Sequence, residues 1–272
     1  MSHDSVIITG SNGDIGTSLS SLFRGSGMPV YSFHDDLRLS NSIILHLAAK
    51  SPPASCDEMI ESNILYLREV VRSAQRYHIE NMIFFSAVSA YGDMDMEDLT
   101  EEGPYGQPGF YGLTKLIGEQ YLKAAGINAL CLRLPAVLGF RNKTNIMSRL
   151  FLKLVNNEAI ELTNHDKLFN NFISIENIFE FIINLRLKHK HDIINLASGK
   201  DLTLNDIAAL MRILTGSSST IRVSREKTNF IGISTKKAGE EYNFVPLDAV
   251  SVITRWVKQR MAYELEGQHG LL

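Results

Sequence analysis

The sequence predicts an α/β fold in which helices cover both faces of a doubly wound parallel sheet. Three observations lead to this fold class. Short apolar runs alternate with segments of helical spacing through the first half of the chain. The first run, Val6-Ile7-Ile8, contains no polar residue, as expected of a strand buried on both faces. A glycine-rich turn follows that strand directly and leads into an amphipathic helix.

The other elements of the first half continue this alternation. Strands are predicted at residues 30–33, 43–47, 82–85 and 129–134. Helices are predicted at residues 17–24, 58–77 and 111–125. In the helix at 58–77 the apolar residues share one face, namely Ile60, Ile64, Leu67, Val70, Val71 and Ala74.

One connection in this half is short. Only about ten residues separate Phe33 from Ile43, whereas a right-handed crossover with its own helix needs at least about a dozen. We therefore expect that one βα unit is reduced and that the sheet has a smaller edge there.

Beyond Gly139 the pattern loosens, which divides the chain into two parts. Residues 1–140 are expected to form the sheet domain and residues 141–272 a smaller α/β lobe, with segments near 170–200 returning to the sheet. Helices are predicted at residues 145–155, 175–187, 204–214 and 247–261. Short strands are predicted at residues 172–173, 192–196 and 220–223.

Composition and charge exclude several classes of function. Hydrophobic residues make up 44% and charged residues 21%, and the formal net charge of −3 provides no basic surface for nucleic acid or an anionic membrane. No apolar run reaches the ~18 residues of a membrane helix, and residues 1–4 lack a signal-peptide pattern, so we expect a cytoplasmic protein. The two cysteines and eight histidines show no ligand spacing, so no metal is expected.

The turn after the first strand has the form of a dinucleotide-binding loop, Thr9-Gly10-Ser11-Asn12-Gly13-Asp14-Ile15-Gly16. Gly10 allows a tight turn, Gly13 allows a pyrophosphate to approach the backbone, and Gly16 allows the helix to pack closely on the strand. The helix that begins beside Asp14 and Ile15 offers N–H donors to the phosphates. Because the loop lies between a buried strand and an amphipathic helix, it predicts binding of NAD or NADP.

Tyr111 and Lys115 are the candidate acid–base pair. Their i,i+4 spacing places the phenol and the ammonium on one helical face. A free tyrosine has a pKa of about 10, and an adjacent cation, together with an oxidised nicotinamide ring, is expected to lower it. Such a tyrosine can exchange a proton with a sugar hydroxyl or keto group while a hydride moves at the same carbon.

Several further segments fall at regular places between and after these two motifs. They are His46-Leu47-Ala48-Ala49, Asn63, Tyr91-Gly92, Leu134-Pro135-Ala136-Val137-Leu138-Gly139, Phe172 to Asn177 and Asn195 to Gly199. With the glycine loop and Tyr111-x-x-x-Lys115, they resemble the extended short-chain dehydrogenases/reductases of the NAD-dependent epimerase/dehydratase family. The resemblance covers nearly the whole chain.

The resemblance implies a Rossmann-type sheet, an NAD or NADP cofactor and a nucleotide-linked sugar as substrate. It implies that Leu47, Ala48, Ala49 and Asn63 lie along the cofactor and that Pro135 and Val137 lie against its nicotinamide. It also implies a homodimer in which the helices at 58–77 and 111–125 of two copies form a four-helix bundle.

The first departure from the family concerns the catalytic serine or threonine, whose place is taken by Ala87. Ser86 and Ser89 flank it. On a strand end Ser89 would point to the same side as Ala87 and take over hydrogen bonding to the substrate oxygen. The other interpretation is that Ser89 only caps the turn.

Two more departures concern the cofactor's adenosine and the substrate's diphosphate. His34 takes the place of the acidic residue that binds the adenosine ribose, followed by Asp35, Asp36 and Leu37, with Arg38 close by. These residues leave the choice between NAD and NADP open. Asn170 stands where sugar epimerases of the family often carry an arginine for the substrate diphosphate, and Arg222, Arg225 and Lys227 are candidate substitutes. The other interpretation, which is favoured for any one of these three, is that they are solvated surface residues.

Two hypotheses about function follow. The first is a reductase or epimerase that acts on a carbonyl or hydroxyl of a nucleotide-activated sugar, and the short chain favours a reductase slightly. The second is a cofactor-binding sensor with little catalysis. Ala87 favours the sensor, whereas intact Tyr111 and Lys115 favour the enzyme.

Overall fold

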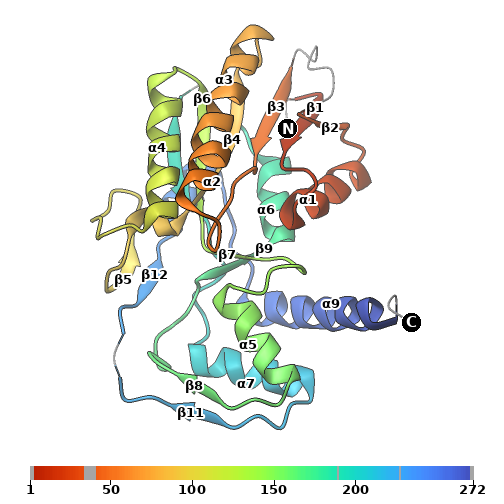
Figure 1. Cartoon of the computed structure of the whole chain (residues 1–272), viewed down its shortest axis with the longest axis vertical. Coiled ribbons are helices and arrows are strands. Elements are labelled where there is room, and N and C mark those ends of the chain that lie inside the picture. The colour runs from red at the N-terminus through yellow and green to blue at the C-terminus, as the bar shows by residue number, and fades with distance from the viewer. Residues whose placement is uncertain (1–2, 34–40, 189, 227, 270–272) are drawn as a thin grey trace.

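The core of the molecule is a parallel sheet, as predicted, and it has six strands (Figure 1). The computed structural model describes residues 3–33, 41–188, 190–226 and 228–269. The strands follow the spatial order β10-β6-β4-β3-β1-β2. Their bounds are β1 Ser5–Thr9, β2 Val30–Ser32, β3 Ser42–His46, β4 Asn81–Ala87, β6 Asn128–Leu134 and β10 Asp192–Asn195.

Helices cover both faces of the sheet because its strands are apolar on both sides. Val6 and Ile8 of β1 pack into a core with α1 (Asp14–Gly25) and α6 (Ile175–Asn184). Ile7, between them, points to the opposite face and packs with α3 (Tyr66–Arg76) and α4 (Phe110–Ala124). The alternation along one fully buried strand confirms the doubly wound arrangement.

The helix predicted at 58–77 is present, but it is interrupted. It begins as α2 (Cys56–Ile60), where Ser55 and Glu58 form a capping box. It then passes through a π-helical turn, η1 (Glu61–Leu65), and continues as α3. Single π-helical turns within α-helices are frequent at functional sites. Here the turn contains the buried Asn63.

The sheet edge is reduced, as the short connection predicted. β3 returns to pair with β1 on the side opposite β2, so β2 is the last strand at this edge among the described residues. Residues 34–40, within the connection, lie outside the described residues.

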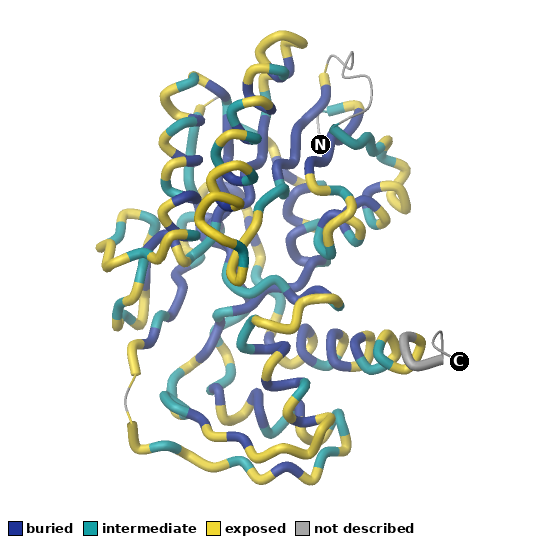
Figure 2. Tube along the Cα trace, in the orientation of Figure 1, coloured by how far each residue is buried: buried dark blue, intermediate teal, exposed yellow. Residues whose placement is uncertain are grey.

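A second core lies below the sheet and is formed by the smaller lobe (Figure 2). Buried side chains of α5 (Ile146–Val155), α7 (Leu204–Thr215) and α9 (Ala249–His269) meet there, with Phe151 packed edge-on against Trp256. The short strands β8 (Ile160–Leu162) and β11 (Ile221–Val223) pair along its outer edge.

The remaining short elements connect the lobe to the sheet. They are β5 (Met96–Leu99) with β12 (Ile231–Ile233), β7 (Ala136–Leu138) with β9 (Phe172–Ser174), and α8 (Lys236–Tyr242). β10 belongs to the segment expected to return to the sheet, and it pairs with β6. None of the helices in the described part of the chain is both long and apolar enough to cross a membrane.

Candidate active site

The glycine loop adopts the conformation that a dinucleotide site requires. Gly10 has a φ of +71°, and a Cβ there would lie 2.9 Å from the Ala48 nitrogen. A Cβ on Gly16 would lie 2.2 Å from the Gly10 oxygen, so α1 can pack this closely on β1 only with glycine. Gly13 has an ordinary φ of −72° and caps α1, where its lack of a side chain leaves the helix N-terminus open.

The Thr9 hydroxyl links the start of the glycine loop to the end of β3 and the residues after it. Thr9 Oγ1 accepts the backbone N–H groups of Leu47 and Ala48, at 3.1 and 3.2 Å. Its proton is therefore donated to Nδ1 of His46, 3.0 Å away. Burial lowers the pKa of His46 to about 3, so this imidazole stays neutral and structural.

A cavity of about 600 Å³ extends from the glycine loop to the start of α4. This volume is within the usual range for small-molecule and cofactor sites. Thirteen of the predicted site residues line it: Gly10, Gly13, Asp14, Ile15, Gly16, Leu47, Ala49, Ser86, Ser89, Tyr111, Lys115, Pro135 and Val137. The structure therefore brings the glycine loop and the Tyr-Lys pair to one cavity.

Lys115 is held rigidly at the floor of this cavity. Its Nζ donates a hydrogen bond to the Phe85 carbonyl oxygen at 2.8 Å and lies 5.6 Å from the centre of the Tyr111 ring. The side chain is buried, and this desolvation lowers the pKa of Lys115 to about 8 despite the nearby Glu119 carboxylate. The ammonium is thus charged at neutral pH but close to losing its proton.

Burial is the main influence on the pKa of Tyr111. Burial raises the pKa of Tyr111 to about 12, because loss of water penalises the charged phenolate. A phenolate near neutral pH would therefore require a further positive charge in the cavity.

Ser86 is engaged in a buried network behind the cavity. Its hydroxyl donates to Glu119 Oε1 at 2.6 Å, and Glu119 forms a salt bridge with Arg133 at 2.7 Å. Both charged side chains are fully buried. Because the Ser86 proton is committed to this carboxylate, Ser86 has no proton to donate to a substrate oxygen.

The strand geometry assumed for Ser89 was wrong. β4 ends at Ala87, and Ser89 lies in a 3₁₀ turn, η2 (Val88–Tyr91), so the two-residue strand period does not apply to it. Ser89 nevertheless lines the cavity and is exposed. The turn packs tightly on α4, since a Cβ on Gly112 would lie 2.1 Å from the Ser89 oxygen.

Asn63 lies behind the cavity wall and does not line it. Its amide accepts from the Lys50 nitrogen at 2.7 Å and donates to the Lys50 oxygen and to Thr114 Oγ1, both at 2.9 Å. It therefore fixes the segment after β3 against α4. Ala48 lies against Gly10, and neither Ala48 nor Asn12 lines the cavity.

Most of the residues that bear on adenosine and diphosphate recognition are not described by the structure. His34, Asp35, Asp36, Leu37 and Arg38 lie outside the described residues, as does Lys227. Asn170 is buried and pairs with the backbone of Ile233 through both ends of its amide, at 2.8 and 3.0 Å.

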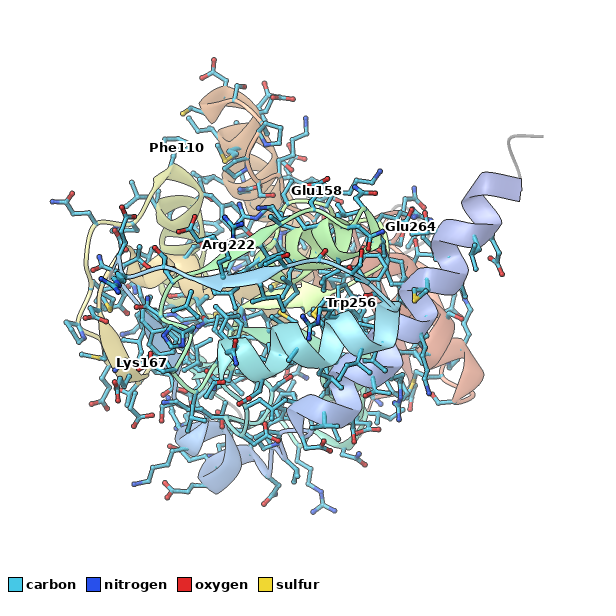
Figure 3. The ribbon with its side chains drawn as sticks, turned by 90° about the horizontal axis from the view of Figure 1, so that it is seen from below. Phe110, Glu158, Lys167, Arg222, Trp256 and Glu264 are labelled. Carbon is cyan, nitrogen blue, oxygen red and sulfur yellow. The ribbon has the colours of Figure 1, made fainter. Side chains whose placement is uncertain are left out.

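Two of the three candidate substitutes for the missing arginine, Arg222 and Arg225, lie away from the cavity. Arg222 is exposed on β11, at the outer edge of the smaller lobe (Figure 3), and Arg225 follows it. Neither lines the cavity. Their sequence position alone did not reveal this, because β11 pairs with β8 and so is directed away from the sheet.

Three residues that close the cavity from the smaller lobe were not predicted, namely Arg141, Asn142 and Asn145. Asn145 also caps α5 by accepting the Ser148 nitrogen at 2.8 Å. The available signal was an Asn before an apolar helical segment, together with a cation directly after the strand that ends near the nicotinamide position.

The sequence matches that of a known family over residues 39–197, which is more than half of the chain; this is the NAD dependent epimerase/dehydratase family. A relative from Methanocaldococcus jannaschii, named "Putative UDP-glucose 4-epimerase", is 23% identical over 159 residues, which are 55% of this chain and 52% of that protein. Protein CapI of Staphylococcus aureus is 26% identical over 46% of this chain and 40% of its own length. The chain thus spans about half the length of the curated relatives it matches.

Solved structures share the fold over almost the full chain. The UDP-N-acetylglucosamine 4-epimerase from Methanobrevibacter ruminantium, in complex with UDP-N-acetylmuramic acid, has a TM-score of 0.78 at 20% identity and covers 97% of this chain and all of its own. The UDP-glucuronic acid 4-epimerase from Bacillus cereus, in complex with NAD, has a TM-score of 0.76 at 18% identity over 94% of this chain and 99% of its own. At these identities the likeness establishes the fold.

Proposed function

Because the chain belongs to the NAD-dependent epimerase/dehydratase family, we propose that it epimerises a nucleotide-linked sugar, with NAD as its cofactor. One observation carries this proposal: the glycine loop, Tyr111 and Lys115 line one cavity. Epimerase is preferred over reductase because the two solved structures described above are 4-epimerases of UDP-sugars.

The cradle at the glycine loop fits the cofactor. Gly10 and Gly16 pack against backbone, and Gly13 lines the cavity at the N-terminus of α1, where N–H groups meet a pyrophosphate. When bound, NAD would accept a hydride from the sugar carbon and give it back. Pro135 and Val137 line the cavity beside Lys115 and would form the wall against the nicotinamide.

The chain's own residues supply the proton chemistry. Tyr111 would take the proton of the sugar hydroxyl as the hydride leaves and return it when the hydride comes back. Because burial raises the pKa of Tyr111, the phenol becomes a base only when the positively charged nicotinamide ring of the cofactor lies beside it. Lys115, fixed by the Phe85 carbonyl, would hold the cofactor's ribose and support the phenolate.

Ser89 would orient the substrate oxygen, because Ala87, at the position of the family's serine or threonine, has no hydroxyl. Ser86 is the less suitable candidate because its proton goes to Glu119, whereas Ser89 is exposed in the turn that packs on the Tyr111 end of α4. Residues 141–272, apart from α6, β10 and α8, which pack on the main sheet, would form the substrate-binding lobe.

We also propose that the enzyme is a homodimer built on α2–α3 and α4, which run side by side on one face of the sheet (Figure 1). These helices present five apolar side chains that are each more than a third exposed: Ile60, Leu65, Phe110, Leu113 and Ile117. Such a patch on a soluble protein favours a protein interface. Light scattering should give twice the chain mass, and Leu113→Glu with Ile117→Glu should give a monomer; a monomeric unmodified protein would contradict the dimer.

The function is tested by incubating the protein and NAD with UDP-glucose, UDP-glucuronic acid or UDP-N-acetylglucosamine and separating the 4-epimers by chromatography. We expect interconversion of at least one pair, without net consumption of NAD. Ala87 specifically favours the second candidate, a cofactor-binding sensor. Firm NAD binding without turnover of any nucleotide sugar would support the sensor and contradict the epimerase.

A further inference from the structure

The loop that joins the sheet to the smaller lobe is clamped from two sides. On one side the Asp14 carboxylate accepts the backbone N–H groups of Phe140, Arg141 and Asn142, at 3.2, 2.9 and 3.3 Å. Gly139 permits this approach, because a Cβ there would lie 2.1 Å from Asp14 Oδ2.

The other side of the loop is held by α9. Trp256 Nε1 donates to the Gly139 oxygen at 3.2 Å, and Arg260 Nη1 donates to the Asn142 oxygen at 3.1 Å. Both side chains are buried, at 3% and 0% exposure. The loop backbone is therefore fixed relative to the first turn of α1.

This clamp places the side chain of Arg141 over the glycine loop. Its Nη1 donates to the Asn12 carbonyl oxygen at a long 3.4 Å, and the residue is exposed and lines the cavity with Gly10, Gly13 and Gly16. No carboxylate of the described residues lies within ion-pair distance of this guanidinium. Its remaining donors are available to a ligand.

The local charge explains why a cation is needed there. Asp14 carries a negative charge in the first turn of α1, the same turn whose N–H groups would receive a pyrophosphate. A carboxylate at that position opposes binding of an anion, even when three N–H groups stabilise it. Arg141 supplies the balancing positive charge on the cavity side.

We propose that Arg141 is a binding residue for the pyrophosphate of the dinucleotide, positioned by Asp14. This inference rests on the proposed function, since it assumes that the cavity takes NAD. The contact with Asn12 places Arg141 at the glycine loop, so the cofactor's pyrophosphate is favoured over the substrate's diphosphate as its ligand.

The test measures dissociation constants for NADH, ADP-ribose and UDP in the Arg141→Ala protein. ADP-ribose has the pyrophosphate without the nicotinamide, and UDP has the diphosphate of a nucleotide-sugar substrate. Loss of a charge-assisted contact should weaken NADH and ADP-ribose alike by about tenfold or more. UDP affinity should stay unchanged.

Lys143→Ala is the matched control, because Lys143 is an exposed cation two residues away that does not line the cavity. It should leave all three affinities unchanged, and circular dichroism should show the same fold in both variants. Undiminished NADH and ADP-ribose affinity in Arg141→Ala, or weakening of UDP alone, would overturn the inference while leaving the proposed function intact. Failure of the unmodified protein to bind any dinucleotide would overturn both.

Discussion

Removing one charge of the buried pair Glu119 and Arg133 should strongly destabilise the sheet domain. Glu119 accepts hydrogen bonds from Ser86 Oγ, Arg133 Nε and Arg133 Nη2, at 2.6, 2.9 and 2.7 Å, and both charged side chains have no exposed area. Glu119→Gln would keep the size of the side chain but leave the guanidinium buried without its counter-charge. Breaking a buried pair in this way typically costs about 3–5 kcal/mol.

The lower end of that range is expected here. Arg133 keeps a hydrogen bond to the Tyr105 hydroxyl at 2.8 Å and stacks 4.5 Å from the centre of the Tyr91 ring. A loss of about 3 kcal/mol, divided by a urea dependence of about 3 kcal/mol per M for a chain of this size, lowers the unfolding midpoint by about 1 M.

Urea unfolding followed by far-ultraviolet circular dichroism measures this shift. Glu69→Gln, an exposed glutamate on α3, is the control and should move the midpoint very little. Replacing both partners, Glu119→Leu with Arg133→Met, should recover most of the loss because neither charge of the pair is then left buried without its partner. An unchanged midpoint in Glu119→Gln would refute the reasoning.

Three further predictions concern the cavity. Gly13→Val should abolish NADH binding, measured by fluorescence titration, because the side chain would fill the space of the pyrophosphate; full affinity in the folded variant would remove the loop from the site. Because burial holds the pKa of Lys115 at about 8, below its usual value, the ammonium is lost as pH rises through 8, and NADH affinity should fall there. In Lys115→Met that pH step should be missing, and a step of the same size would assign it to another group. Ser89→Ala should lower turnover, because the lost hydrogen bond raises the activation free energy by about 1–3 kcal/mol. Ser86→Ala is compared in the same assay. Unchanged turnover in Ser89→Ala would leave Ser89 as a turn residue only.

The sheet domain was predictable because its signals are local. Strands such as Val6-Ile7-Ile8 are buried on both faces and contain only apolar residues, and the glycine loop follows at a fixed place. The break of the long helix at Glu61–Leu65 was not predictable, because its apolar spacing is continuous and the π turn depends on the contact of Asn63 with Thr114 on another helix.

The elements and site residues that were not predicted correctly depend on contacts between distant segments of the chain. β5 contains acidic residues and forms only because β12, far along the chain, pairs with it. Arg141 reaches the cavity only because Asp14 and α9 fix its loop. The Ser89 error arose from extending β4 two residues too far, where the chain turns to pack against Gly112.

The rate of epimerisation in Tyr111→Phe, measured with the nucleotide sugar that the unmodified protein converts, tests the central claim most directly. The substitution removes only the hydroxyl, so NADH affinity should stay nearly unchanged while turnover falls by about 10²–10⁴-fold, the usual contribution of general acid–base catalysis. Turnover equal to that of the unmodified protein would show that Tyr111 does not carry the proton.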